Sequence, residues 1–389
     1  MKIPFAYVWR SLWARRVTTL LTITGVTLVV FVFAGVLMLA RGLQATLVDT
    51  GGPDNVIVLR RSANSELVSQ IDRQTASILE SQPEVVTGPD GHPVIAKELM
   101  VVINLTRKGT HDVTNVSVRG VSPQSLALRP GVRVTEGRQF TFGTHEVIVG
   151  RNVADRFAGA SIGSQLTFGG DRWTVVGVFD AGHTGFDSEI WGDVDQQMQA
   201  FGRPVYSSVT LKLQNPTQLA PLQTRLQADP RAQYIDLKPE QQYYREQSQG
   251  LATFIRILGL VVTIIFSVGA MIGAMITMYA AVANRVVEVG TMRALGFRRR
   301  NVLGAFLLEA IVLAIVGGLA GIALASLLSF AHVSTMNFNS FSEIGFGFRL
   351  SPDVIVAALL FAVVMGVVGG FLPAVRAARL NIVDALRSP

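Results

Sequence analysis

A basic segment at residues 285–301 carries the side chains of this chain that are best placed to bind a partner. It holds five arginines, Arg285, Arg293 and those at 298–300, and lies between two long apolar runs. Glu288 near its start and Arg293 near its end match the sign of the helix dipole, and Gly296 suits a left-handed position just past a helix end. The segment therefore predicts a short helix that ends at Gly296.

One face of this predicted helix is apolar. Over residues 285–295, three helical turns bring Val289, Met292 and Leu295 or Gly296 to the same side. A short apolar-faced helix held at both ends by apolar runs can transmit force to or from a partner. The alternative is a loop on the membrane surface whose arginines contact lipid headgroups.

A single acid, Glu309, interrupts the apolar run that follows. Carboxylates inside a membrane are costly and rare, so such a residue is by default a candidate for function. Glu309 is close to the start of the run, however, and the arginines of the preceding segment are within reach. Pairing with one of these arginines is therefore favoured over a role in transport.

Sequence motifs for catalysis and metal binding are weak. The sequence contains no G-x-x-x-x-G-K-[ST] segment and no cysteine, and its five histidines lack metal-ligand spacing. A G-x-S-x-G match at 159–163 lacks the strand-then-helix order of a nucleophile elbow. His183, near Asp180, Asp187 and Glu189, is a poor metal candidate. We predict no catalytic site, no metal and no cofactor on this chain.

Four apolar runs position these residues. Residues 17–40, 257–283 and 354–372 carry no charge, and residues 302–331 carry only Glu309. Each run exceeds the roughly 18 apolar residues that indicate a transmembrane helix. The fold class predicted is an α-helical integral membrane protein with four transmembrane helices and a large α+β extracytoplasmic domain between the first and second.

The distribution of the net charge of +7 indicates how the chain is oriented in the membrane. Residues 43–250 hold 19 Lys/Arg against 22 Asp/Glu, and the remaining residues hold 15 against 5. Twelve basic residues flank span ends on one predicted side, namely Lys2, Arg10, Arg15, Arg16, Arg285, Arg293, Arg298, Arg299, Arg300, Arg376, Arg379 and Arg387. The positive-inside rule places both termini and the 285–301 loop in the cytoplasm. No nucleic-acid partner is predicted.

The expected organisation follows these runs. We expect an interfacial amphipathic helix at 1–16 (or simply the start of the first span), spans at 17–42, 251–284, 302–331 and 353–375, a coupling loop at 285–301, a short outer loop at 332–352 and a cytoplasmic tail at 376–389. Residues 239–256 are expected to continue helically into the second span as a stalk. Helix-packing contacts are expected at three close glycine pairs, Gly269 and Gly273, Gly317 and Gly321, and Gly366 and Gly370.

The outer domain at 43–250 is expected to have two parts. Its two ends, 43–88 and 204–250, each read as strand, helix and short strand, whereas 89–203 is mostly strands and turns. We expect an α+β subdomain built from the ends, with a β-rich insert. The expected strands are at 55–59, 100–105, 115–119, 146–150, 173–179 and 207–213, and the expected helices at 66–80, 152–157 and 217–228.

Several segments together resemble the FtsX-like permeases, the MacB-type class of ABC transporters. The sequence RVVEVGTMRALG at 285–296 followed by LEA at 308–310 is similar to the hallmark of that family, and PAVRAARLNIVDALR at 373–387 to its usual ending. VRGVSP at 118–123, EGRQF at 136–140 and VIVG at 147–150 resemble its periplasmic core domain. The resemblance covers essentially the whole chain.

The resemblance implies four spans, one large outer domain in the periplasm or outside the cell, and residence in the bacterial cytoplasmic membrane. It implies a dimer with itself or a homologous permease, contact with lipids, and an ABC ATPase dimer that binds ATP and Mg. This sequence departs from MacB in carrying no fused ATPase, so a separate ATPase is expected. The residues implied to bind the ATPase are Arg285, Glu288, Val289, Met292, Arg293, Leu295 and Gly296.

The function implied is mechanotransmission, in which ATP-driven closure moves the outer domain. Export of an amphiphilic or peptide-like substrate is the leading expectation, and a periplasmic adaptor of the membrane-fusion type is a possible partner. A lipoprotein-releasing role and a non-transporting role in regulating envelope enzymes are alternatives within the family. A membrane receptor without an ATPase is an alternative outside it.

Overall fold

The computed structural model describes residues 16–110, 112–337 and 341–380. The predicted interfacial helix at 1–16 lies outside the described residues except for Arg16, and so does the tail beyond 380. The chain divides into two compact units. One, the sheet unit, comprises Gly42–Ala252 and His332–Gly347. The other, the helical unit, comprises the remaining described residues.

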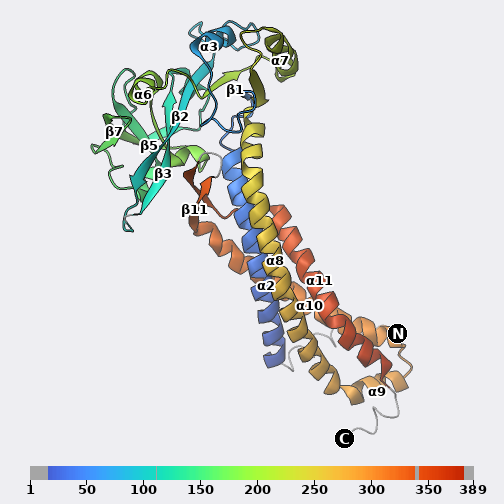
Figure 1. The fold of residues 1–389 in the computed structure, drawn as a ribbon. Helices are drawn as coiled ribbons and strands as arrows, with labels where there is room; N and C mark the ends of the chain where they lie inside the picture. The colour runs from blue at the N-terminus through green and yellow to red at the C-terminus, as the bar shows by residue number, and fades with distance from the viewer. Residues whose placement is uncertain (1–15, 111, 338–340, 381–389) are drawn as a thin grey trace. The chain divides into compact units, whose positions relative to one another are not determined.

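Four long helices are apolar enough to cross a membrane. They are α2 (Arg16–Val48), α8 (Glu240–Ala283), α10 (Arg299–Ser326) and α11 (Pro352–Arg379), and Figure 1 labels them along the chain. The helical unit also contains two short helices. One is α9 (Val286–Ala294), between α8 and α10, and the other is the 3₁₀ helix η3 (Leu327–Phe330), directly after α10. The four predicted spans are confirmed. The helix predicted to continue from about residue 239 into the second span is also confirmed, because α8 is unbroken.

Two apolar clusters hold the helical unit together. One joins α2, α10 and α11 through Val30, Met38, Ile322 and Ala358. The other joins α8, α9, α10 and α11. Many of the buried residues are alanine or glycine, which lets helix backbones approach closely where lipid supplies no hydrophobic drive for association.

The sheet unit contains a ten-stranded sheet in the order β10-β1-β9-β2-β3-β8-β5-β7-β4, with β6 paired to β7. The β3/β8 and β5/β7 pairs are parallel and the others antiparallel. The strands are β1 (Asn55–Arg60), β2 (Ile95–Thr106), β3 (Val113–Val121), β4 (Arg133–Gly137), β5 (Glu146–Gly150), β6 (Gln165–Phe168), β7 (Asp171–Asp180), β8 (Glu189–Asp193), β9 (Ser208–Lys212) and β10 (Ile235–Pro239).

Helices in the sheet unit are short. They are α3 (Arg73–Glu80), α4 (Gln124–Ala127), α5 (Arg151–Arg156), α6 (Val194–Ala200) and α7 (Leu219–Ala228), with 3₁₀ turns η1 (Gly185–Ser188) and η2 (Pro216–Gln218). The helix predicted at 66–80 is too long at its start. Ile71 instead pairs with Tyr206 through backbone hydrogen bonds, and the Asp72 side chain caps α3 by accepting from the Thr75 N–H at 2.7 Å.

The two ends of the outer domain meet as predicted, since β1 pairs with both β9 and β10. The insert at 89–203 is not a separate body, however. Strand β2 is 12 residues long, and its first residues pair with β9 while the rest pair with β3. One long strand thus serves both parts of the sheet, which makes the sheet continuous.

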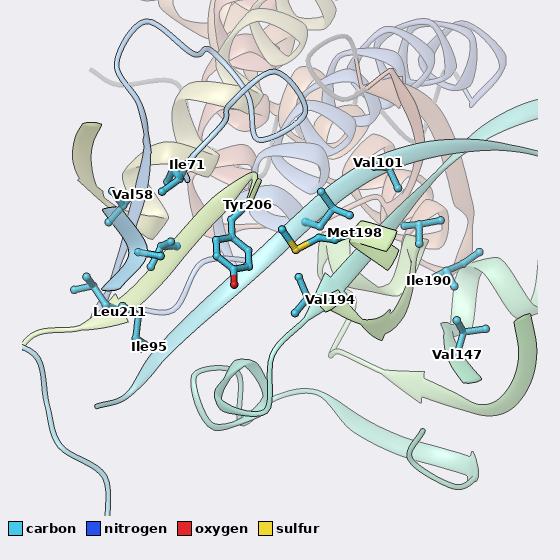
Figure 2. Packing of buried hydrophobic residues seen from close by; sticks show 14 of the residues in the cluster. Val58, Ile71, Ile95, Val101, Val147, Ile190, Val194, Met198, Tyr206 and Leu211 are labelled. Atoms are coloured by element: carbon cyan, nitrogen blue, oxygen red, sulfur yellow. The ribbon is translucent and has the colours of Figure 1, made fainter. Parts of the chain in front are cut away.

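The core of the sheet unit is continuous as well (Figure 2). It extends from Val58 and Leu211, on strands from the two ends of the domain, to Val147 and Ile190 in the predicted insert. Burial of this shared apolar surface is the main stabilising contribution to the unit. The sequence analysis did not predict this, because the strand expected at 100–105 leaves out residues 95–98, the part of β2 that pairs with β9.

A two-stranded hairpin lies where a short outer loop was expected. Its strands are β11 (His332–Asn337) and β12 (Ser342–Gly347), which pair antiparallel. The hairpin joins α10 to α11 in the sequence, yet it belongs to the sheet unit, where β12 packs against β3 and η1. The short outer loop expected at 332–352 therefore contains a β-hairpin, whose Ile344 and Phe346 are buried.

Candidate functional site

Helix α9 is present in the predicted segment, and its end has the predicted geometry. The Gly296 N–H donates to the Arg293 carbonyl and the Phe297 N–H to the Met292 carbonyl, both at 3.1 Å. Gly296 has a φ of +94°. These two bonds form a Schellman motif, in which glycine is preferred because L side chains are strained at positive φ. The helix end predicted at Gly296 is confirmed.

A buried ion pair fixes the start of α9 to α10. The Arg285 Nη1 donates to Glu309 Oε2 at 3.1 Å, and the two side chains are 6% and 7% exposed. The Arg285 Nε also lies 3.8 Å from the Glu288 carboxylate, and the guanidinium lies 6.0 Å from the centre of the Phe306 ring. The structure thus gives Glu309 the arginine partner that the sequence favoured.

The apolar residues of α9 do not share one face. Val289 is fully buried against α8, α10 and α11, and Met292 packs on the same cluster. Leu295 is 70% exposed. Because residues six positions apart lie about 120° apart around a helix, Val289 and Leu295 point in different directions. The prediction of a single partner-facing surface containing all three residues is wrong.

The outer face of α9 comprises Val287, Thr291, Ala294 and Leu295, which are all exposed. Val287, Thr291 and Leu295 follow the i, i+4, i+8 spacing of one helix face. Glu288 is exposed beside them, whereas Arg293 is half-buried. The inner face packs on the protein's own spans, and the outer face is the exposed one.

Two of the three glycine pairs lie at helix contacts. A Cβ added at Gly317 would come within 3.0 Å of the Ile23 carbonyl oxygen, and one at Gly321 within 2.8 Å of that of Thr27, so this pair packs on α2. Gly366 and Gly370 likewise pack on Ala310 of α10. In contrast, a Cβ at Gly269 or Gly273 meets nothing within 4 Å. The α8 pair therefore has open space beside it in this chain.

We expect Gly366→Val and Gly269→Val to differ sharply in stability. Valine at Gly366 must push α11 away from α10, and overpacking of this kind costs about 1–3 kcal/mol. Valine at Gly269 enters open space within the single chain, so the unfolding free energy of the monomer should change by no more than about 0.5 kcal/mol. Thermal denaturation of the detergent-solubilised protein measures both. Equal losses for the two variants would contradict the assigned contacts.

The sheet unit holds a buried ion network that the sequence analysis missed. Arg119 on β3 is 1% exposed and donates five hydrogen bonds, at 2.7–3.1 Å, to Glu66, Glu98 and Glu189. A guanidinium group has five N–H donors, so the number of hydrogen bonds equals the number of donors that Arg119 has. The one available signal was a charged residue inside the predicted strand at 115–119.

Arg129 extends this network to the start of α8. It makes a two-pronged ion pair with Glu98 and reaches Glu240, the first residue of α8, at 3.4 Å. The other Glu240 oxygen accepts from the Gly52 N–H and the Asn55 side chain, both at 2.8 Å. Burial raises the pKa of the Glu98 carboxyl, but Arg129 and Arg119 outweigh burial and hold that pKa below its usual value. The network therefore ties the first turn of α8 to the sheet.

A cavity of about 50 Å³ adjoins the network. Its walls include Glu66, Arg119 and Tyr244, with Ser342 and Glu343 of the hairpin. This volume suffices for a few water molecules at the roughly 10–15 Å³ that each requires. The Glu66 and Glu343 carboxylates in this wall are already engaged in ion pairs with arginines.

The G-x-S-x-G match at 159–163 and the acidic residues near His183 do not have the arrangement that their motifs require. At 159–163, α5 precedes and β6 follows, which is the reverse of a nucleophile elbow. Asp180, Asp187 and Glu189 near His183 form no metal-binding group, nor does any other set of three or more His, Asp or Glu within residues 16–110, 112–337 and 341–380.

Four apolar helices, a large mixed sheet unit inserted after the first and a short helix between the second and third match the architecture expected of a membrane permease. Family models agree with this class. The model of the MacB-like periplasmic core domain matches residues 19–229, more than half of the chain, and that of the FtsX-like permease C-terminal region matches residues 260–382. The chain belongs to the MacB/FtsX family of ABC transporter permeases.

Relatives of known sequence carry matching names. The macrolide export ATP-binding/permease protein MacB of Neisseria gonorrhoeae is 28% identical over 302 residues, covering 72% of this chain and 45% of that protein. An uncharacterized ABC transporter permease of Bacillus subtilis, YvrN, is 26% identical over 420 residues, covering 97% of this chain and 98% of that protein. The chain thus spans about half the length of the MacB proteins it matches.

Among solved structures, the periplasmic region of MacB from Actinobacillus actinomycetemcomitans is similar to this chain. It is 13% identical, with 49% of this chain and 91% of that chain covered and a TM-score of 0.39.

Proposed function

We propose that this chain is the membrane subunit of an ABC transporter that exports an amphiphilic or peptide-like substrate. A separate ATPase binds ATP and Mg and supplies the energy. The observation that carries the proposal is α9, whose inner face is locked to three spans while its outer face is exposed. YvrN matches this chain along nearly its whole length and is named as a permease, which supports an ATPase on a separate polypeptide.

Helix α9 is suited to pass force from the ATPase to the spans. The Arg285–Glu309 pair fixes its start to α10, and Val289 packs against α8, α10 and α11. Breaking a buried ion pair costs about 3–5 kcal/mol, so a load on α9 reaches the spans before these contacts part. The chain then moves its sheet unit, which lies outside the cytoplasm, without passing substrate between its helices.

A second permease copy, the same chain or a homologue, fits along α8. Only 17% of the apolar core of α8 is buried, against 39% in each of the other spans. Gly269 and Gly273 stand on α8 with open space beside them, and small residues at this spacing permit close helix pairing. A dimeric permease would match a dimeric ATPase, and a periplasmic adaptor is a further candidate partner of the sheet unit.

We expect charge on the outer face of α9 to abolish ATPase binding. Leu295→Asp and Thr291→Asp place a carboxylate in the proposed contact without touching the inner face. Their complexes with the ATPase should fall at least tenfold in co-purification, whereas Val113→Asp, at a 67% exposed position of the sheet unit, should leave binding unchanged. ATPase recovery with Leu295→Asp at the level of the unmodified chain would contradict the proposal. Met292→Asp is unsuitable, since Met292 packs inside the protein.

The proposed orientation places both termini and α9 in the cytoplasm of a bacterial cell and the sheet unit outside it. The chain has no cysteine, so single introduced cysteines report topology cleanly. A cysteine at Ser161, exposed in the sheet unit, should react with an impermeant maleimide in intact cells. One at Arg299, exposed beside α9, should react only after permeabilisation. The opposite labelling pattern would refute this orientation.

A further inference from the structure

The β11–β12 hairpin is bound to the sheet unit through Glu343. This carboxylate is buried, and its Oε2 accepts from the Arg107 Nε at 3.0 Å and Nη2 at 2.5 Å. Its Oε1 lies 2.6 Å from Arg156 Nη2. The same Arg156 group donates to Ser334 on the other hairpin strand at 2.5 Å. Two arginines of the sheet unit therefore hold both strands of the hairpin.

Uncharged contacts continue this attachment along β12. The Ser117 hydroxyl on β3 donates to the Ser342 hydroxyl at 2.7 Å. The Asn115 side chain donates to the Phe341 carbonyl at 2.7 Å. The Gly345 N–H donates to the Ser188 hydroxyl at 3.0 Å. The hairpin is thus built into the sheet unit rather than resting on it.

The chain leaves the hairpin with almost no slack. Strand β12 ends at Gly347, and the next residue, Phe348, already packs in the helical unit with Leu350 against the α2, α10 and α11 cluster. The Arg349 N–H donates to the Met38 carbonyl at 3.1 Å. Consecutive Cα atoms are only about 3.8 Å apart. A larger displacement of this end of α11 must therefore pull on the hairpin.

We propose that the hairpin is a second mechanical linkage between the helical unit and the sheet unit, and that Glu343 is the positioning residue that keeps it attached. The proposal rests on the proposed function and deepens it, because motion then reaches the sheet unit through α10 and α11 as well as through α2 and α8. The hairpin stays attached to the sheet unit throughout the ATP cycle. Glu343 acts through Arg107 and Arg156 and touches no substrate.

Two kinds of variant test this linkage in the complete transporter with its ATPase. Glu343→Gln removes the carboxylate charge, and Glu136→Gln is its control, since Glu136 forms an exposed ion pair in the same unit. Four glycines inserted between Gly347 and Phe348 add up to about 14 Å of slack and leave Glu343 intact. The same insertion between Gly169 and Gly170, in the turn that joins β6 to β7, is the control.

Replacing Ser117 and Ser342 by cysteine gives a reversible test of the attachment between the hairpin and the sheet unit. Their hydroxyls are 2.7 Å apart, and no other cysteine is present, so a disulfide there should lock the hairpin to β3. Formation of this disulfide in membranes without ATP tests the attachment itself. The lock should leave ATP-dependent export unchanged in the otherwise unmodified chain, and it should restore export to Glu343→Gln until a reductant is added.

Export is measured as cell survival on a panel of amphiphilic antibiotics, with ATP hydrolysis of the purified complex in parallel. We expect Glu343→Gln and the insertion after Gly347 to lower export at least tenfold with ATP hydrolysis retained, and both controls to stay within twofold. Export at full level with the insertion after Gly347, or its loss in the locked chain, would overturn the linkage. Absence of export by the unmodified chain would instead refute the proposed function, and the disulfide arm would still decide whether the hairpin is attached.

Discussion

Arg119→Leu should unfold the sheet unit under conditions in which the unmodified protein is stable. The substitution leaves Glu66, Glu98 and Glu189 buried around an apolar side chain, although all three accept hydrogen bonds from Arg119 and form ion pairs with it in the native protein. Removing one partner of a buried ion pair costs about 3–5 kcal/mol, and this residue serves three carboxylates. We expect a loss at the upper end of that range, which is a large part of the 5–15 kcal/mol that stabilises a typical domain.

Tryptophan fluorescence during urea denaturation measures this loss in the solubilised chain. Trp173 and Trp191 are fully buried in the sheet unit, and the Trp191 indole donates to Glu189 at 2.8 Å. Arg138→Leu is the control, because its pair with Glu146 is exposed and such pairs contribute about 1 kcal/mol or less. A loss below about 1 kcal/mol for Arg119→Leu would show that the network does not hold the unit together.

The sequence predicts the membrane helices well because their signal is local. A run of some 20 apolar residues has few alternatives to a spanning helix. The same holds for the end of α9, where Gly296 adopts the left-handed conformation that its residue type suggested. Strands rich in β-branched residues, such as β5 and β7, are also found at or near their predicted limits.

The features that the sequence did not predict depend on contacts between distant residues. An arginine such as Arg119 is expected at the surface when the sequence is considered locally. In the structure it is buried, because Glu66, Glu98 and Glu189 from three other segments surround it. The hairpin reads as a loop because its own residues form only a two-stranded ribbon, which is marginal alone. It is stabilised by β3, more than 200 positions earlier in the chain.

At the candidate site, the sequence analysis also misassigned which side chains of α9 point away from the protein. Helical spacing identified α9 as amphipathic, but spacing alone does not say whether an apolar face meets a partner or the protein's own spans. Val289 and Met292 pack inward, and the exposed residues Val287 and Thr291 were not among those expected to bind the ATPase. The glycine pairs show the same limit, since three similar pairs divide into two at contacts and one in open space.

Export should fail when α8 is made flexible near Gly250. Helix α8 runs unbroken from Glu240, which is tied to the ion network, to Ala283 beside α9. If movement of α9 reaches the sheet unit through this helix, its stiffness matters more than its side chains. Three glycines inserted after Gln249 put a run of residues that each disfavour helix by about 1 kcal/mol in the path of the force.

Gly250→Ala is the matched control. A Cβ at Gly250 meets nothing within 4 Å, and alanine favours helix over glycine by about 1 kcal/mol. This variant should export at least as well as the unmodified chain. Together the two variants separate loss of stiffness from any change of residue at this position.

The most direct test of the account is ATP-dependent export by the transporter carrying the three-glycine insertion after Gln249, measured in vesicles together with ATP hydrolysis. Force transmission through α8 predicts that the ATPase still binds and hydrolyses ATP while export falls at least tenfold. A simple tether predicts no change, since lengthening a loop has only a small effect on the free energy. Export at the level of the unmodified chain would contradict force transmission through α8.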